Sequence, residues 1–410
     1  MNYPKISLFG LLLLLCYSVE AQQHPLQTIL KENPNLFEVV ISQPERYETQ
    51  IIYTQINRDA QNRPHFTSYT YGVDSSRYFY PASTIKMPVA FAALEKLRLL
   101  QIEGLDRNSP MHTGVGRPPQ TAAQIDSTAP TGSPSLGHYI RKIFAVSDND
   151  ASNRLYEFLG QEYLNRSLRA KGFDQLRIVH RLGPSGAAFG PEDNQYTNPI
   201  SFYNDQQLLY HQGPVHSKIP FQLQLQGTQK GQAYYAQGEK VNQPFDFSPK
   251  NFISLQNLHD LLKTVLFPES VPEQQRFAFT KEDYQFLYHC LSIRPRECKA
   301  PVYDKPDGYV KFFLYGGATD SIPDHIRIYN KVGWAYGYLT DVAYIVDFKQ
   351  QTEFLLAATI HVNANQTYND NTYEYETIGL PFLQNLGQVI YDYEVRRKKG
   401  YLPDLSYLKK

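Results

Sequence analysis

The sequence has few of the residues that indicate a metal site, a disulfide scaffold or a nucleic-acid surface. Its 410 residues include three cysteines, one tryptophan and three methionines. The eleven histidines show no paired spacing on a predicted helix, so neither a metal ion nor any other cofactor is expected. The 40 basic and 40 acidic residues cancel without a basic stripe, which argues against a nucleic-acid partner. The 32 tyrosines and 23 phenylalanines argue against disorder.

Only the N-terminus carries a long hydrophobic run. Lys5 precedes an apolar stretch over residues 6–19 that is too short to span a bilayer comfortably and is followed by small residues. This pattern predicts a removable signal peptide over residues 1–21 and an exported protein, periplasmic or secreted, with no transmembrane segment after its removal. A lipid anchor at Cys16 is the alternative, but bulky Leu15 stands where lipoprotein signals carry a small residue.

Two cysteines remain after that signal, Cys290 and Cys298. An oxidising compartment would allow a disulfide between them, worth roughly 2–3 kcal/mol through loop-closure entropy. Two unpaired thiols are the alternative, and the sequence does not decide between them.

Strand patterns at both ends of the chain enclose a helical middle. β-rich runs predict strands over residues 50–56, 65–71, 326–332, 338–348 and 353–362. Apolar periodicity predicts helices over residues 83–104, 138–146, 151–159, 255–266, 281–291 and 378–397. The fold class is therefore α/β (mixed α+β), with an antiparallel sheet built from N- and C-terminal strands, flanking helices and an inserted, mainly helical lobe.

One catalytic domain over residues 22–410 accommodates this pattern. We expect a sheet lobe over about residues 22–82 and 300–410, and a helical lobe over about 83–299. The Gly-, Pro-, Asn- and Gln-rich stretch at about 183–250 predicts an insertion of loops and short strands.

A serine and a lysine three residues apart begin the first long helix. Positions three apart share a helical face, so Ser83 and Lys86 can come within reach of each other. A serine hydroxyl becomes a good nucleophile when a base takes its proton, and a lysine can do so when burial lowers its pKa. Free N–H groups at the helix start can stabilise an oxyanion. Alone, the motif is common, and a helix-start serine beside a solvated lysine is then the simpler explanation for it.

Two further motifs follow along the chain. Ser147-Asp148-Asn149 lies between two predicted helices, where a hydroxyl can relay a proton and an amide can hold a carbonyl, although such residues also cap helices. Lys331-Val332-Gly333 ends a β-run, where lysine can face a substrate carboxylate and glycine permits close approach. An edge-strand lysine before a turn is the structural alternative.

The order of these three motifs resembles class A β-lactamases and penicillin-binding proteins. Residues 252–258 also resemble the helix start after the active-site loop of that family, and residues 337–346 resemble its next strand. The aspartate at 148 points to class A rather than to the carboxypeptidases. The resemblance implies a β-lactamase-like fold and a serine hydrolase that works through an acyl-enzyme.

The resemblance also implies residue roles. Ser83 would be the acylated nucleophile, Lys86 its base or proton relay, and Ser147 the donor of a proton to the leaving nitrogen. The N–H groups of Ser83 and Trp334 would form the oxyanion hole. The remaining substrate-binding positions would be Asn149, Lys331 and Gly333.

Three departures from the family pattern qualify these roles. Val332 replaces a hydroxyl residue that helps to bind the lactam carboxylate, and bulky Trp334 can narrow the cleft. The third is the length of the 183–250 stretch, which interrupts the loop that carries the family's deacylation glutamate. Glu192 and Glu239 are the candidates for that base, and the absence of any such base is the third possibility.

These observations predict a class A β-lactamase-like enzyme that hydrolyses β-lactams or related amides. One alternative is a penicillin-binding-protein-like peptidase or esterase on cell-wall fragments that releases lactams slowly. Another is a non-catalytic binding protein with the same fold. In each case we expect a small-molecule partner, such as a β-lactam or a peptidoglycan-like fragment, and a monomer.

Overall fold

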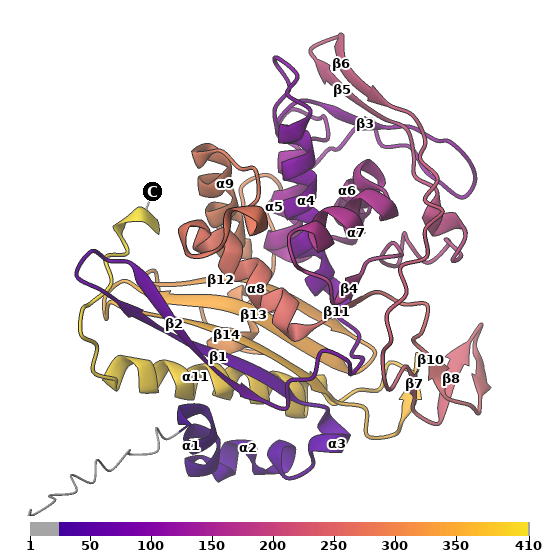
Figure 1. The fold of residues 1–410 in the computed structure, drawn as a ribbon. Helices are drawn as coiled ribbons and strands as arrows, with labels where there is room; N and C mark the ends of the chain where they lie inside the picture. Colours follow the sequence, from indigo (N-terminus) through magenta and orange to yellow (C-terminus); the bar gives the residue numbers. More distant parts are fainter. Residues whose placement is uncertain (1–23, 409–410) are drawn as a thin grey trace, which may run out of the picture.

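The structure is a computed structural model that describes residues 24–408, so the predicted signal peptide and Cys16 lie outside the described residues. A five-stranded antiparallel sheet forms the centre, in the order β12-β13-β14-β1-β2 (Figure 1). Its strands are β1 (Gln50–Arg58), β2 (Pro64–Tyr71), β12 (Ile326–Ala335), β13 (Tyr338–Asp347) and β14 (Thr352–His361). The predicted mixed α/β class with an antiparallel sheet is confirmed.

Strands from the two ends of the chain meet inside this sheet. β1 pairs with β14, with Gln50 opposite Thr359, and β13 pairs with both β12 and β14. Every residue of β13 and β14 is buried, as expected for strands covered on both faces. β12 forms one edge of the sheet.

Helices from the two ends of the chain cover one face of the sheet. The long helix α11 runs along this face, with the N-terminal helices beside it (Figure 1). Buried side chains such as Phe37, Leu383 and Ile390 pack there against Ile51 and Leu356 of the sheet. The elements of this layer are α1 (Pro25–Glu32), α2 (Pro34–Ile41), α3 (Pro44–Tyr47), α10 (Phe312–Tyr315) and α11 (Leu380–Arg396).

The opposite face carries the helical lobe. Leu258 and Leu262 of α8 are buried in one core with Ile52 and Val342 of the sheet. The lobe's helices are α4 (Lys86–Leu99), α5 (Leu136–Val146), α6 (Asn149–Leu159), α7 (Gln161–Ala170), α8 (Leu255–Leu266) and α9 (Lys281–Ser292).

Within residues 24–408, ten short strands lie outside the central sheet, six of them within the loop-rich stretch at about 183–250. They form small two- and three-stranded sheets at the side of the molecule (Figure 1). Their bounds are β3 (Met111–Thr113), β4 (Leu176–Arg177), β5 (Ile200–Asn204), β6 (Gln207–Gln212), β7 (Gln229–Lys230), β8 (Ala233–Ala236), β9 (Glu239–Val241), β10 (Phe245–Asp246), β11 (Phe252–Ile253) and β15 (Thr367–Tyr368).

Five helices within the described residues were not predicted from the sequence. Three of them, α1 to α3, have at most eight residues and each begins at a proline, which suits the first helical position but interrupts a longer periodic pattern. The other two are α7 and the four-residue α10. Cys290 and Cys298 are free thiols in the structure, the former fully buried. Over residues 24–408, no helix combines the length and the apolar character needed to cross a bilayer.

Candidate active site

A tight turn presents Ser83 at the start of α4. The 3-10 helix η1 (Ala82–Ile85) leads directly into α4, and Ala82 adopts a left-handed conformation with φ of 46°. Such a conformation is costly for a residue with a Cβ and is typical of functional turns. The Thr84 amide and hydroxyl both donate to the Pro81 carbonyl, at 3.0 and 2.6 Å, and fix the turn. Ser83 itself is half-buried and lines a cleft.

Lys86 is fully buried beneath this turn. Its Nζ donates to the Ser147 carbonyl at 2.5 Å, to Ser147 Oγ at 3.2 Å and to Asn149 Oδ1 at 2.5 Å. Burial lowers the pKa of Lys86 to about 7, and the charge of Asp148 opposes this shift only in part. A large fraction of Lys86 is therefore neutral near pH 7 and able to accept a proton.

Ser147 joins two buried lysines. It ends α5 in a left-handed conformation, with φ of 59°, and its Oγ accepts a hydrogen bond from Lys331 Nζ at 2.9 Å. Burial, together with the charge of Lys86, holds the pKa of Lys331 well below its usual range. When Lys86 is neutral, the Ser147 hydroxyl can accept from Lys331 while donating to Lys86. The geometry thus provides a proton path between the two amines.

The Ser-Asp-Asn motif serves local structure as well. Asp148 caps the N-terminus of α6 by accepting from the Ala151 amide at 2.8 Å. Asn149 reaches across the site, because its Nδ2 donates to the Gly183 carbonyl while its Oδ1 holds Lys86. Asp148 therefore caps α6 while its two neighbours, Ser147 and Asn149, place polar side chains in the site.

Gly333 allows the edge strand to lie against the nucleophile turn. A Cβ at this position would stand 2.6 Å from the Pro81 carbonyl oxygen and 2.9 Å from the Ser83 amide nitrogen. Real Cβ atoms do not approach backbone atoms so closely, so only glycine fits without movement. The Ser83 amide and the end of β12 are thereby brought side by side, which is the arrangement that an oxyanion hole requires.

A cleft of about 430 Å³ opens above these residues. Trp334 forms an aromatic wall that is 42% exposed and stacks on Tyr375 with ring centroids 5.9 Å apart. Tyr373 belongs to an Asn- and Tyr-rich loop after β14, Tyr375 begins the helical turn that follows this loop, and Tyr336 belongs to the β12–β13 turn. These three tyrosines line the cleft but were missed in the sequence, where only the local density of tyrosine and asparagine marks them.

Neither predicted deacylation glutamate lies in this cleft. Glu192 is exposed, with its carboxylate 4.0 Å from Arg117, and Glu239 is exposed on β9. The residues that line the cleft between positions 24 and 408 include no aspartate or glutamate. The structure therefore brings together the seven predicted site residues, and it separates both glutamates from them.

A second buried polar cluster supports β12 from behind. Lys311 Nζ donates to the Leu291 and Ile328 carbonyls, both at 2.9 Å, and to Asn330 Oδ1 at 2.6 Å. Asn330 in turn donates to Asp341 Oδ1 at 2.8 Å. Because Asn330 immediately precedes Lys331, this cluster fixes the strand that carries the second lysine.

Comparisons with known proteins show similarity in sequence and in fold. The model of the β-lactamase enzyme family matches residues 39–232. The β-lactamase regulatory protein BlaB of Streptomyces cacaoi is 27% identical over 125 residues, and the match covers 28% of this chain and 37% of BlaB. The chain thus spans little more than a third of that relative's length.

One solved structure extends the likeness of fold to nearly the whole chain. A PBP-A structure superposes with a TM-score of 0.50 at 14% identity, covering 91% of this chain and 96% of that one. A β-lactamase from Sphaerobacter thermophilus gives 0.48 at 12% identity, covering 92% and 98%. Residues 39–232 of this chain therefore match the β-lactamase enzyme family, and the fold of nearly the whole chain is similar to that of PBP-A.

Proposed function

We propose that this protein opens β-lactams or related amide bonds by forming an acyl-enzyme on Ser83, and that it releases the acyl group slowly. The proposal rests on one observation: two buried lysines, Lys86 and Lys331, both form a hydrogen bond with the hydroxyl of Ser147, beside the turn that carries Ser83. Desolvated amines supply the base that a serine nucleophile needs.

Acylation follows from the positions of these groups. Neutral Lys86 accepts the proton as Ser83 Oγ attacks the carbonyl carbon, and the Ser83 amide stabilises the oxyanion. The C–N bond then breaks. The leaving nitrogen takes a proton from Ser147, which regains one from Lys86 through the hydrogen bond between them. Protons and electrons balance without any external group.

For release of the acyl group, the described cleft lacks a carboxylate that could act as the base. Hydrolysis of an ester needs a base to activate water, and no carboxylate lines the described cleft. In class A β-lactamases a glutamate activates this water. We therefore expect this chain to form the acyl-enzyme as class A enzymes do, but to hydrolyse it slowly, as a penicillin-binding protein does. An apolar residue, Val332, stands where the family has a hydroxyl, so this position supplies no side-chain hydrogen bond to a lactam carboxylate.

The test is mass spectrometry of the intact protein after exposure to benzylpenicillin and to a cephalosporin. We expect one adduct, mapped to the peptide that contains Ser83, in the parent protein and in Ser270→Ala, which changes an exposed serine of the helical lobe. Ser83→Ala should give none. Labelling of Ser83→Ala, or no labelling of the parent protein, would exclude this function. Export through the N-terminal signal is part of the same proposal, because β-lactams and cell-wall fragments lie outside the cytoplasm.

A further inference from the structure

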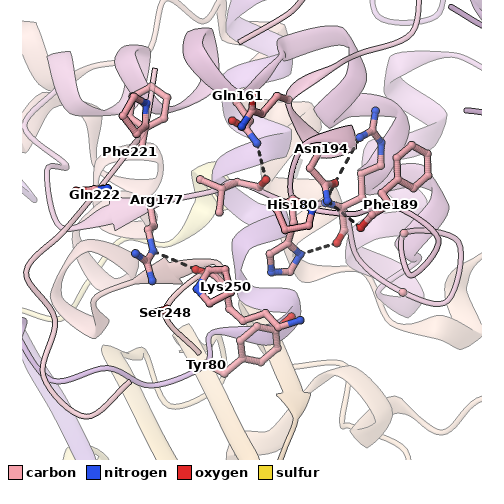
Figure 2. Close-up of a pocket in the computed structure, with 18 of the residues that line it drawn as sticks. Tyr80, Gln161, Arg177, His180, Phe189, Asn194, Phe221, Gln222, Ser248 and Lys250 are labelled. Atoms are coloured by element: carbon pink, nitrogen blue, oxygen red, sulfur yellow. Dashed lines mark hydrogen bonds between the residues drawn. The ribbon is translucent and has the colours of Figure 1, made fainter. Parts of the chain in front are cut away.

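A second hollow of about 670 Å³ adjoins the cleft of Ser83. Tyr80, Gly183 and Tyr336 line both, so a ligand held at Ser83 can extend into the second hollow past these residues. Figure 2 shows Arg177, His180, Lys250 and Tyr80 around it. Its walls come mainly from β4, the loop after it, residues 219–222 and the loop before β11.

The charge of this hollow is unbalanced and positive. Among the described residues that line it, none is an aspartate or glutamate, whereas Arg177, Arg181 and Lys250 are basic. Arg181 is paired with Glu157 at 3.1 Å, so its charge is compensated. Arg177 and Lys250 belong to no ion pair within residues 24–408; Asp246 acts on Arg177 only as a more distant charge. Two cations at the wall therefore lack a counter-ion.

Arg177 is the second, independent indication of a ligand. Its side chain is only 7% exposed, and its Nε donates to the Lys250 carbonyl at 3.0 Å. Its Nη2 is buried and has no hydrogen-bond partner among the described residues. A buried guanidinium with an unused donor is costly, and an anion that accepts from it would remove that cost. Burial lowers the pKa of both Arg177 and Lys250, which is the direction expected for cations without partners.

His180 adds an acceptor beside these donors. Its Nδ1 lies 2.7 Å from the Arg181 carbonyl, a contact that requires the proton to be on Nδ1. Burial lowers the pKa of His180 to about 4, so the ring is neutral, and its Nε2 has no partner among the described residues. Nε2 can therefore accept from a ligand N–H or O–H group.

Resting on the proposed function, we propose that this hollow is a subsite for a carboxylate-bearing arm of the molecule that acylates Ser83. The carboxylate would accept from Arg177 Nη2 and lie near the Lys250 ammonium, and an amide or hydroxyl of the same arm would donate to His180. The preferred substrate is then an acyl donor with a second negative charge, remote from the bond that breaks.

The experiment compares two penicillins that differ only at the end of the side chain. Adipoyl-6-aminopenicillanic acid ends in a carboxylate, and hexanoyl-6-aminopenicillanic acid has the same length and ends in a methyl group. The measured quantity is the ratio of their second-order rate constants for acylation of Ser83. We expect a ratio well above one in the parent protein, and a fall of roughly tenfold in Arg177→Gln and in Lys250→Gln, as for a lost charged hydrogen bond.

Lys349→Gln is the matched control, because it removes one exposed lysine in the β13–β14 turn at the other end of the sheet and should leave the ratio unchanged. Because Lys250 is only partly buried, Lys250→Gln should fold. It therefore tests the subsite even if Arg177→Gln does not fold. A parent ratio near one, or a ratio that Lys250→Gln leaves intact, would overturn the subsite. If neither penicillin acylates Ser83, the proposed function itself fails.

Discussion

Lys86 has the most unusual environment of the residues in the cleft. Its ammonium has three acceptors, two of them on Ser147, yet none of these acceptors is a carboxylate, and the negative charge that acts on it belongs to Asp148. Burial without a direct ion-pair partner is the condition that turns a lysine into a base.

Acylation should therefore depend on the protonation of Lys86. Because the pKa of Lys86 is lowered to about 7, the neutral fraction rises as the pH increases through 7. The second-order rate constant for benzylpenicillin should rise with pH from 5 to 8 and then level off. Lys86→Gln should lower the plateau by roughly 10²- to 10⁴-fold, the usual contribution of a general base. A rate that is independent of pH in the parent protein would contradict this role.

A second prediction at the scale of one residue concerns Gly333. Gly333→Ala should slow acylation at least tenfold and lower the free energy of unfolding by about 1–3 kcal/mol, because the new methyl group would displace the turn of Ser83. Gly400→Ala is the matched control, since a Cβ there meets nothing within 4 Å. Rates and urea unfolding measure both effects. An unchanged rate in Gly333→Ala would show that β12 and the turn need not touch.

Among the elements, β12 does most to assemble the site. It carries Lys331 and Gly333 at the edge of the sheet, while Asn330 ties it to a buried cluster on the neighbouring elements. Asp341 of β13 anchors that cluster, because it accepts from Asn330 and from the amides of Phe312 and Phe313. Burial raises the pKa of Asp341 to about 6 and lowers the pKa of Lys311 to about 7.

Removing the carboxylate of Asp341 should destabilise the protein strongly. Asp341→Ala leaves the backbone amides of Phe312 and Phe313 and the side-chain amide of Asn330 without their buried acceptor, and it removes a negative charge that favours protonated Lys311. Losing one member of a buried charged cluster usually costs about 3–5 kcal/mol. Urea unfolding measures the loss, and Asp304→Ala, which alters an exposed aspartate, should change stability by less than about 0.5 kcal/mol. Equal stability of the two variants would show that the cluster does not support β12.

For the molecule as a whole, the sequence predicted the helices and strands better than the tertiary contacts between them. The alternating strands and the periodic helix at 255–266 follow from local patterning, and the pairing of β1 with β14 follows from strands at both chain ends. The motif order also indicated which polar residues would meet. Local pattern could not show that Lys331 and Lys86 share Ser147, because that contact joins residues 184 positions apart in the chain.

The same limit explains what the sequence missed. The Tyr373–Tyr375 wall, the Lys311 cluster and the basic hollow beside Arg177 depend on loops whose course is set by tertiary packing. Glu192 and Glu239 were proposed as bases from their distance along the chain to the other motifs. That distance cannot locate a residue in space when an insertion of unknown path lies in between. Only the structure shows both carboxylates away from the cleft.

The lifetime of the acyl-enzyme tests the central claim most directly. Intact-mass spectra would be recorded at intervals after a short exposure to benzylpenicillin and removal of excess drug, beside a hydrolysis assay with a chromogenic cephalosporin. We predict one stoichiometric adduct on Ser83 that persists for many minutes, with little turnover, because no carboxylate of the described cleft activates water. An adduct that disappears within seconds while the cephalosporin is hydrolysed rapidly would contradict this account.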